Sequence, residues 1–304
     1  MTTFAELVGC RLPVQLAGMG GGISDVSLAT AVCEAGGLGM LGAAGLTPVP
    51  ELLEAMPDGL SFGVNFLMPF VDPDAVKIAS SRARVVEFFY GDPDEALVSM
   101  VHDGGALAAW QVGSSGEAAA AVAAGCDFVV AQGTEAGGHV RGKLPLAELL
   151  AQLDVSVPVV AAGGIGTAKD VARVLSAGAT GVRIGTRFLA ANESCAHPLY
   201  VSALVASSAD DTTLTETFSV GWPDAPHRVL SSCIEQAEAA EDDTIATLRT
   251  AGGDVPLPRL GTIPPTRAVH GRISAMPLYA GTSVGAVTGR VPAADIVAEL
   301  LSGL

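Results

Sequence analysis

The stretch PVVAAGGIGTAKDVARVLSAGATGVRIGTRF, residues 158–188, contains the structural unit from which the fold can be inferred. An apolar run leads into a double glycine, a helix-like segment follows, and a glycine separates that segment from a second apolar run. Thr167 can cap the helix and Asp170 lies in its first turn, while Val171, Val174 and Leu175 form an apolar stripe along one side. The segment therefore predicts a strand, a helix and a second, parallel strand.

The same pattern recurs along the chain, for example in VCEAGGLGMLGA, VHDGGALAAWQVG and AVAAGCDFVVAQG. Each helix-like part ends at a glycine, the residue that takes up the left-handed stop without a Cβ clash. In the first helix, Ser24 is the expected N-cap and Leu28, Val32 and Cys33 form the apolar face. The eight segments expected to be strands are 12–18, 38–43, 60–67, 84–90, 106–112, 127–132, 158–162 and 181–185.

These segments begin about 20 to 30 residues apart, which suits one strand and one helix each time. Eight such units predict an α/β protein of the (β/α)8 TIM-barrel type, with its site at the carboxyl ends of the strands. The alternative, a doubly wound open sheet, would place a GxGxxG motif after the first strand. Here that turn reads AGMGGGIS, and the richest glycine turns follow the last three strands, which favours the barrel.

The repeat stops near residue 207. We expect residues 1–206 to form the barrel with the cofactor site and residues 207–280 to form an excursion or cap packed on it, around a helix at SSCIEQAEAAEDD. Residues 281–304 would return to the barrel through a helix with Pro292 near its first turn. All three parts would belong to a single structural domain.

Composition excludes several classes of function. The formal net charge of −16 disfavours nucleic acid as a partner. The N-terminus shows no secretion signal, and no apolar run reaches the length of about 18 residues that a membrane helix needs. The five cysteines are dispersed without CxxC spacing, as in a reduced, cytoplasmic protein, and no cluster predicts a metal site.

Two neighbouring turns can bind a phosphate. The strand at 158–162 opens into Gly163 and Gly164, and the strand at 181–185 opens into Gly185 and Thr186. Together they offer free backbone N–H groups and a hydroxyl, which suits an acidic chain that lacks basic side chains for this task. The alternative is that the glycines only make tight turns.

QGTEAGGHVRG, residues 132–142, places several functional groups after the sixth strand. Gln132 can contact a ligand through its amide, and Gly137 and Gly138 would let the backbone approach a flat ring. His139 can exchange a proton near neutral pH, although a loop histidine can also be satisfied by solvent. Glu135 could orient the imidazole or cap the loop, and both interpretations remain open.

Other residues could complete the pocket. Asn65 interrupts an apolar strand and needs a partner, which could be a ligand or a neighbouring strand. Met19 and Gly20 lie in the glycine-rich turn after the first strand. Trp222, Pro223 and His227 could line the pocket mouth or belong to an ordinary packed loop, and Arg141 and Lys143 could meet an anionic substrate or face water.

The motifs QGTEAGGH, AAGGIGT, GTRF, GVNF and AGMGGG together resemble the nitronate monooxygenase family, formerly called 2-nitropropane dioxygenases, over nearly the whole chain. The resemblance implies an FMN-bearing barrel in which His139 is the catalytic base. The FMN contacts would be Met19, Gly20, Asn65, Gln132, Gly137, Gly138, Gly163, Gly164, Arg183, Ile184, Gly185 and Thr186. Three departures from the family pattern concern the substrate. VEFFYG has Glu87 where the family motif has serine, and HVRG has two residues between histidine and glycine where the family usually has one. Near the C-terminus, AGTSVGAV has Thr282 where the family often has Gly–Gln before a run of small residues.

The implied activity is oxidation of alkyl nitronates, and of nitroalkanes as further candidates, by O2 to a carbonyl compound and nitrite. The partners would be a small-molecule substrate and O2, with a homodimer as one candidate assembly. Flavin-dependent NAD(P)H enoyl reductases share the barrel and a similar glycine–histidine turn, and a flavin-binding module without turnover is a further alternative. An inosinate dehydrogenase would need a loop cysteine, but Cys126 begins a strand and Cys195 follows the last one.

Overall fold

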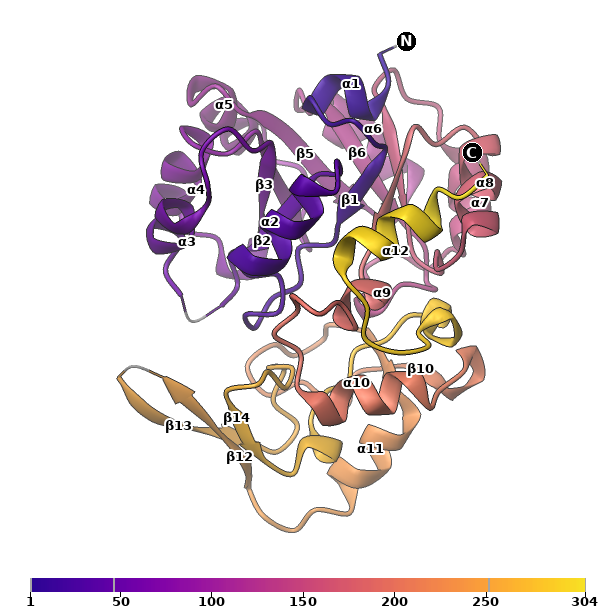
Figure 1. Cartoon of the computed structure of the whole chain (residues 1–304). Coiled ribbons are helices and arrows are strands. Elements are labelled where there is room, and N and C mark those ends of the chain that lie inside the picture. The colour runs from indigo at the N-terminus through magenta and orange to yellow at the C-terminus, as the bar shows by residue number, and fades with distance from the viewer. Residues whose placement is uncertain (1, 46, 251, 304) are drawn as a thin grey trace.

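Eight parallel strands form a closed barrel in the computed structural model, which describes residues 2–45, 47–250 and 252–303 (Figure 1). The sheet order is β1-β9-β8-β6-β5-β4-β3-β2. Backbone hydrogen bonds between β1 and Leu38 close the ring, with the N–H of Leu38 2.8 Å from the carbonyl oxygen of Val14. The predicted TIM barrel is confirmed, and its strands are β1 Val14–Leu16, β2 Gly39–Gly42, β3 Phe62–Leu67, β4 Val85–Phe89, β5 Leu107–Val112, β6 Phe128–Gln132, β8 Val159–Ala162 and β9 Gly181–Ile184.

Helices surround the barrel, and α2, α4, α5, α6, α7 and α8 pack directly against its strands through their apolar sides. Helix α12 closes the chain, starts directly after Pro292 as expected, and packs against α2, α8 and α9. Within the described residues no helix has both the length and the apolar character that crossing a membrane requires. The helices around the barrel are α1 Phe4–Val8, α2 Val26–Glu34, α3 Val49–Ala55, α4 Pro73–Ser80, α5 Glu95–Asp103, α6 Ser115–Ala123, α7 Leu146–Gln152, α8 Ala168–Ser176, α9 Thr186–Leu189 and α12 Ala293–Leu300, with the 3-10 turn η1 Met68–Phe70.

The helix caps show one correct and one wrong expectation. Thr167 caps α8 as predicted and forms a capping box with Asp170. Ser24 does not cap α2. Asp25 is the N-cap, because its carboxylate accepts the N–H of Leu28 at 3.1 Å. The Ser24 hydroxyl instead donates to the carbonyl of Ala17 at 2.8 Å and so fixes the turn after β1.

The cap is a second layer with its own apolar core, visible in Figure 1 as the orange half below the barrel. Tyr200 and Phe218 are fully buried in this core, and α10 belongs to it although it precedes residue 207. The domain boundaries from the sequence stay a prediction. The cap elements are α10 Pro198–Val205, η2 Ala209–Asp211, β10 Thr212–Thr215, β11 His227–Leu230, α11 Ser231–Glu238, β12 Thr244–Thr250, β13 Gly253–Pro258, β14 Val269–Gly271, η3 Ile273–Ala275 and η4 Thr282–Ala286.

A short strand, β7 (Gly138–His139), joins the two layers. It pairs antiparallel with β11, which places His139 opposite His227 and Gly138 opposite Arg228. The N–H of Val140 also donates to the carbonyl of Pro226 at 2.8 Å. The segment expected to be a loop after β6 is therefore a backbone-bonded edge of the cap sheet β10-β11-β7.

The cap of α8 gives a stability prediction. Thr167→Ala removes the acceptor for the N–H of Asp170 and should lower the free energy of unfolding by about 1 kcal/mol in urea denaturation. Thr167→Ser keeps the hydroxyl and should stay close to the original value. Equal stabilities of the alanine and serine variants would contradict this assignment.

Candidate active site

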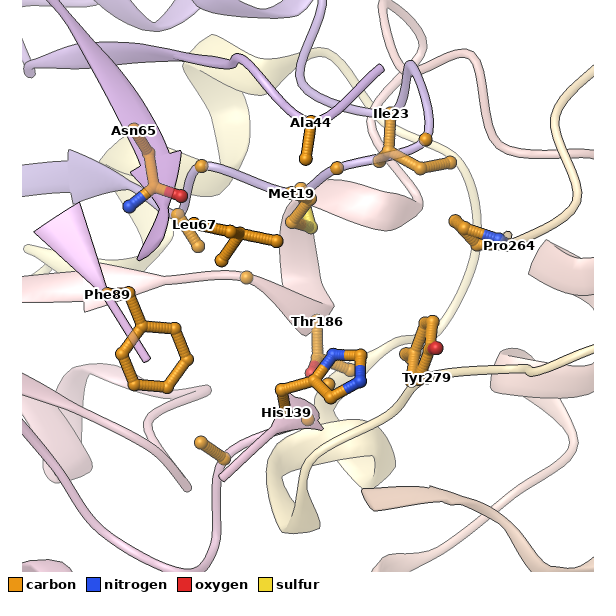
Figure 2. A pocket seen from close by; sticks show the side chains of 18 of the residues that line it. Met19, Ile23, Ala44, Asn65, Leu67, Phe89, His139, Thr186, Pro264 and Tyr279 are labelled. Carbon is orange, nitrogen blue, oxygen red and sulfur yellow. The ribbon is translucent and has the colours of Figure 1, made fainter. Parts of the chain in front are cut away.

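A cavity of about 590 Å³ lies over the carboxyl ends of the barrel strands, between the barrel and the cap. In Figure 2, Asn65 and Leu67 reach it from β3, while His139 and Tyr279 lie side by side across it. The structure brings nearly all of the residues expected from the sequence to its wall. They are Met19, Gly20, Asn65, Gln132, Gly137, Gly138, His139, Gly163, Gly164, Arg183, Gly185 and Thr186.

Ile184 is the exception. Adjacent residues of a strand point to opposite faces, so Ile184 points away from the cavity that Arg183 lines. Its side chain is 1% exposed and packs in the barrel core. Only its main chain takes part in the rim, where its carbonyl accepts the N–H of Ala17.

Glycines form one wall of the cavity, and at three of them a larger residue would be strained or would clash. Gly163 and Gly164 have φ values of +107° and +67°, in the region that favours glycine. A Cβ on Gly137 would lie 2.5 Å from the backbone nitrogen of Gly281, closer than real Cβ contacts. The Gly281 N–H donates to the Thr186 hydroxyl oxygen at 3.0 Å. The two predicted turns thus meet a third glycine segment, at Gly281, that the sequence analysis did not identify as part of the site.

His139 is held at the cap-facing side of the cavity. Its ring stacks on Trp222 with centroids 3.9 Å apart, and its carbonyl accepts a hydrogen bond of 3.0 Å from Gln132 Nε2. Burial, and secondarily the nearby His227, lowers the pKa of the His139 imidazole from 6.5 to about 3. Its Nε2 has no hydrogen-bond partner among the described residues. The imidazole is therefore neutral at physiological pH, and it accepts a proton readily only where a nearby anion compensates for its burial.

His227 has a different role from His139. It is fully buried, its Nε2 accepts the N–H of Phe218 at 3.2 Å, and its Nδ1 lies 2.8 Å from the carbonyl oxygen of Ala225. These two partners require a neutral ring that carries its proton on Nδ1. Of the residues expected at the mouth, Trp222 lines the cavity, whereas His227 is packed behind His139 and Pro223 is exposed.

Two of the remaining charged candidates have structural partners, and the third is exposed. The Glu135 carboxylate accepts the N–H of Leu146 at 2.9 Å and so caps α7, and no hydrogen bond joins it to His139 in the described structure. Arg141 forms ion pairs with Asp92 and Glu117. Lys143 is exposed and lies outside the cavity wall.

The cavity also has a polar floor with an unused acceptor. Asn65 lines the cavity, where a ligand could reach it, and it also donates to the Glu87 carboxylate of the next strand at 2.8 Å. The ligand and the neighbouring strand, which the sequence left open as partners of Asn65, are therefore both supported. Gln132 Oε1 is buried without a hydrogen-bond partner among the described residues. An unpaired buried amide oxygen costs about 1–3 kcal/mol, which favours a role in accepting a hydrogen bond from a ligand.

No group of three His, Cys, Asp or Glu side chains in residues 2–45, 47–250 and 252–303 is arranged to hold a metal ion. The site instead combines close backbone approach, an unpaired amide acceptor and a neutral imidazole. Together with the fold, these features suit a ligand that is flat and carries a phosphate, at the usual place of the active site in a barrel enzyme.

The chain belongs to the nitronate monooxygenase family, whose sequence profile matches residues 2–73 and 62–303. It is a flavin-dependent oxidoreductase. The resemblance expected from the glycine and histidine motifs is therefore confirmed.

Known proteins similar to this chain include both curated sequences and solved structures. A (3aS,4S,5R,7aS)-5-hydroxy-7a-methyl-1-oxo-octahydro-1H-indene-4-carboxyl-CoA dehydrogenase of Mycobacterium tuberculosis is 32% identical over 264 residues, which cover 83% of this chain and 73% of that protein. The structure of FabK from Thermotoga maritima is similar with a TM-score of 0.79 at 28% identity, covering 99% of this chain and 95% of FabK. A nitroalkane oxidase from Streptomyces ansochromogenes gives a TM-score of 0.76 at 29% identity, covering 97% and 96%.

The low pKa of His139 predicts a pH dependence of stability. Because the folded pKa of about 3 lies below the unfolded value, the unfolded state binds the proton first and stability is lost as pH falls below about 6.5. Between pH 6.5 and 4.5, the free energy of unfolding of the original protein should fall by about 2 kcal/mol more than that of His139→Gln in urea denaturation.

The comparison of the two proteins at pH 8 supplies the control. There the imidazole is neutral in both the folded and the unfolded state, so any difference measures packing alone. Parallel stability curves for the two proteins from pH 8 to 4.5 would show that the imidazole is not held neutral by the fold.

Proposed function

We propose that this enzyme uses FMN to oxidise alkyl nitronates with O2, giving a carbonyl compound and nitrite, and that His139 is its base. The observation that carries the proposal is the neutral His139 imidazole, whose Nε2 is unpaired among the described residues, in the wall of a glycine-lined cavity. Support also comes from family membership and from the similarity to a nitroalkane oxidase structure.

The residues present fit an FMN molecule. Gly163, Gly164 and the Gly185–Thr186 turn would hold the phosphate with backbone N–H groups and a hydroxyl. Gln132 and Arg183 offer an acceptor and donors to the polar edge of the isoalloxazine ring, and the turn at Met19–Gly20 allows its close approach. When bound, the flavin supplies electron transfer from the substrate to O2.

The task of His139 depends on the form in which the substrate arrives. With a neutral nitroalkane, the unprotonated imidazole accepts the proton from the carbon next to the nitro group, and the resulting imidazolium pairs with the nitronate anion. That pairing offsets the burial that otherwise keeps the pKa of His139 low. A nitronate formed in solution needs no proton transfer and depends less on this residue.

The first functional test compares these two substrate forms. His139→Ala should still bind its yellow flavin, while its kcat/KM for neutral nitroalkanes falls about 10²- to 10⁴-fold because the general base is lost. The decrease in kcat/KM with nitronates as substrates should be much smaller. The measurement is nitrite release under air by the flavin-loaded variant.

His102→Ala is the matched control, since it removes a histidine of α5 that lies outside the cavity and should leave both rates unchanged. Full nitroalkane turnover by flavin-loaded His139→Ala would remove this residue from the proposed role.

A second candidate is a flavin-dependent oxidoreductase that exchanges electrons between NAD(P)H and an acyl thioester, as enoyl reductases do. It is favoured by the 32% identity to a protein named as a carboxyl-CoA dehydrogenase. A smaller apolar pocket of about 170 Å³ also adjoins the cavity and shares the lining residues Gly221, Thr262 and Ile263 with it.

Anaerobic mixing in a stopped-flow spectrometer separates the two candidates. We expect an alkyl nitronate to bleach the flavin absorbance near 450 nm within seconds, because enzymes typically complete about one or more turnovers each second, and NADPH to leave the absorbance unchanged. Rapid bleaching by NADPH together with no response to nitronate would instead establish the reductase.

A further inference from the structure

A layer of buried polar side chains crosses the barrel at the floor of the cavity. Such groups are rare inside a barrel because they lose water and must find partners within the protein. Each member comes from a different strand, and three of them (Asn65, Gln111 and Arg183) line the cavity. The layer consists of Gln15, Asn65, Glu87, Gln111 and Arg183.

Glu87 is the centre of this layer. It is 0% exposed, and its carboxylate accepts hydrogen bonds from Gln15 Nε2 and Asn65 Nδ2, both at 2.8 Å, as well as from Arg183 Nη1. Three donors therefore converge on one carboxylate. This number of contacts fixes the carboxylate in position and compensates for its removal from water.

Arg183 reaches Glu87 across the barrel. Its strand β9 and the strand β4 of Glu87 are separated by three strands in either direction around the sheet, so the ion pair spans the interior. The same Nη1 donates to Gln111 Oε1 at 2.6 Å. The other guanidinium N–H groups, on Nη2 and Nε, make no hydrogen bond among the described residues. Because Arg183 lines the cavity, these donors are available to a ligand.

We propose that Glu87 is a positioning residue that holds the Arg183 guanidinium at the cavity floor, and that this buried pair sets the reduction potential of the bound flavin. The proposal rests on the proposed binding of FMN. It concerns a residue at which this chain departs from the serine of the family motif.

The physical reason is charge. Reduction adds electrons to the flavin, so a nearby cation favours the reduced form and a nearby anion disfavours it. Both effects are strengthened in a buried site of low dielectric constant. Arg183 lines the cavity and Glu87 lies behind it, so the cation should dominate while the carboxylate moderates its effect.

The test uses Glu87→Gln, Arg183→Gln and the double variant, each loaded with FMN. The midpoint potential is measured by anaerobic photoreduction with a reference dye, and the Kd by titrating the apoprotein with FMN. At a fixed potential, Glu87→Gln should raise the ratio of reduced to oxidised flavin at least tenfold, a shift of about +30 mV for a two-electron couple. Arg183→Gln should lower this ratio at least tenfold and raise the Kd for FMN.

The double variant protects the test against misfolding, because it leaves no unpaired charge inside the barrel. Its ratio of reduced to oxidised flavin should lie between the ratios of the original protein and Arg183→Gln. Its Kd for FMN should be at least tenfold above that of the original protein. Thr167→Ala is the control for stability alone and should keep the original potential, since Thr167 lies outside the cavity.

If every variant that folds keeps the ratio of reduced to oxidised flavin within twofold of the original, the pair is purely structural and the proposal is overturned. If the original protein bound no FMN, both this inference and the proposed function would fail. Failure of nitronate turnover alone would leave the potentials, and this inference, unaffected.

Discussion

The antiparallel pairing of β7 with β11 is the constraint on which the site depends. A barrel alone brings glycine turns to one rim, but the segment after β6 would be a free loop without the cap. The pairing fixes His139 opposite His227 and brings Trp222 onto the imidazole ring. The cap therefore does more than cover the cavity, because it determines where the proposed base lies.

The two histidines on the paired strands β7 and β11 have different chemistry because their hydrogen-bond partners differ. The backbone partners of His227 satisfy both of its nitrogens and hold it as a neutral spacer. His139 is half-buried among aromatic rings, and its Nε2 lacks a protein partner in the described part of the chain. In the floor of the same cavity, by contrast, Glu87 and Arg183 form an ion pair that several hydrogen bonds hold in place. The cavity thus has a neutral side and a charged side.

The barrel and most of the cavity wall could be predicted because their signals are local. An apolar run followed by glycine identifies a strand end, and the carboxyl ends of parallel strands must meet at one rim. The sequence alone places the α2 cap one residue too early, since serine and aspartate are both good caps and only the reach of the Asp25 carboxylate to Leu28 decides between them.

The rest depends on contacts between residues far apart in the sequence. Two residues, Gly138 and His139, give too short a pattern to predict a strand, and their partner strand lies in the cap. Glu87 could be identified only as a departure from a motif, because its partner Arg183 is 96 residues away and on the opposite side of the barrel. Gly281 joins the cavity wall for a similar reason: its neighbour Gly137 belongs to another segment of the chain.

The two tryptophans of the chain occupy contrasting environments. Trp110 is fully buried in the barrel wall, where its indole N–H donates to the carbonyl of Gly91 at 3.0 Å, whereas Trp222 forms part of the cavity wall. A molecule that enters the cavity can contact the Trp222 indole, whereas the Trp110 indole is enclosed in the barrel wall. The ultraviolet fluorescence of Trp222 should therefore change when the cavity is occupied, which would give an optical signal without any attached dye.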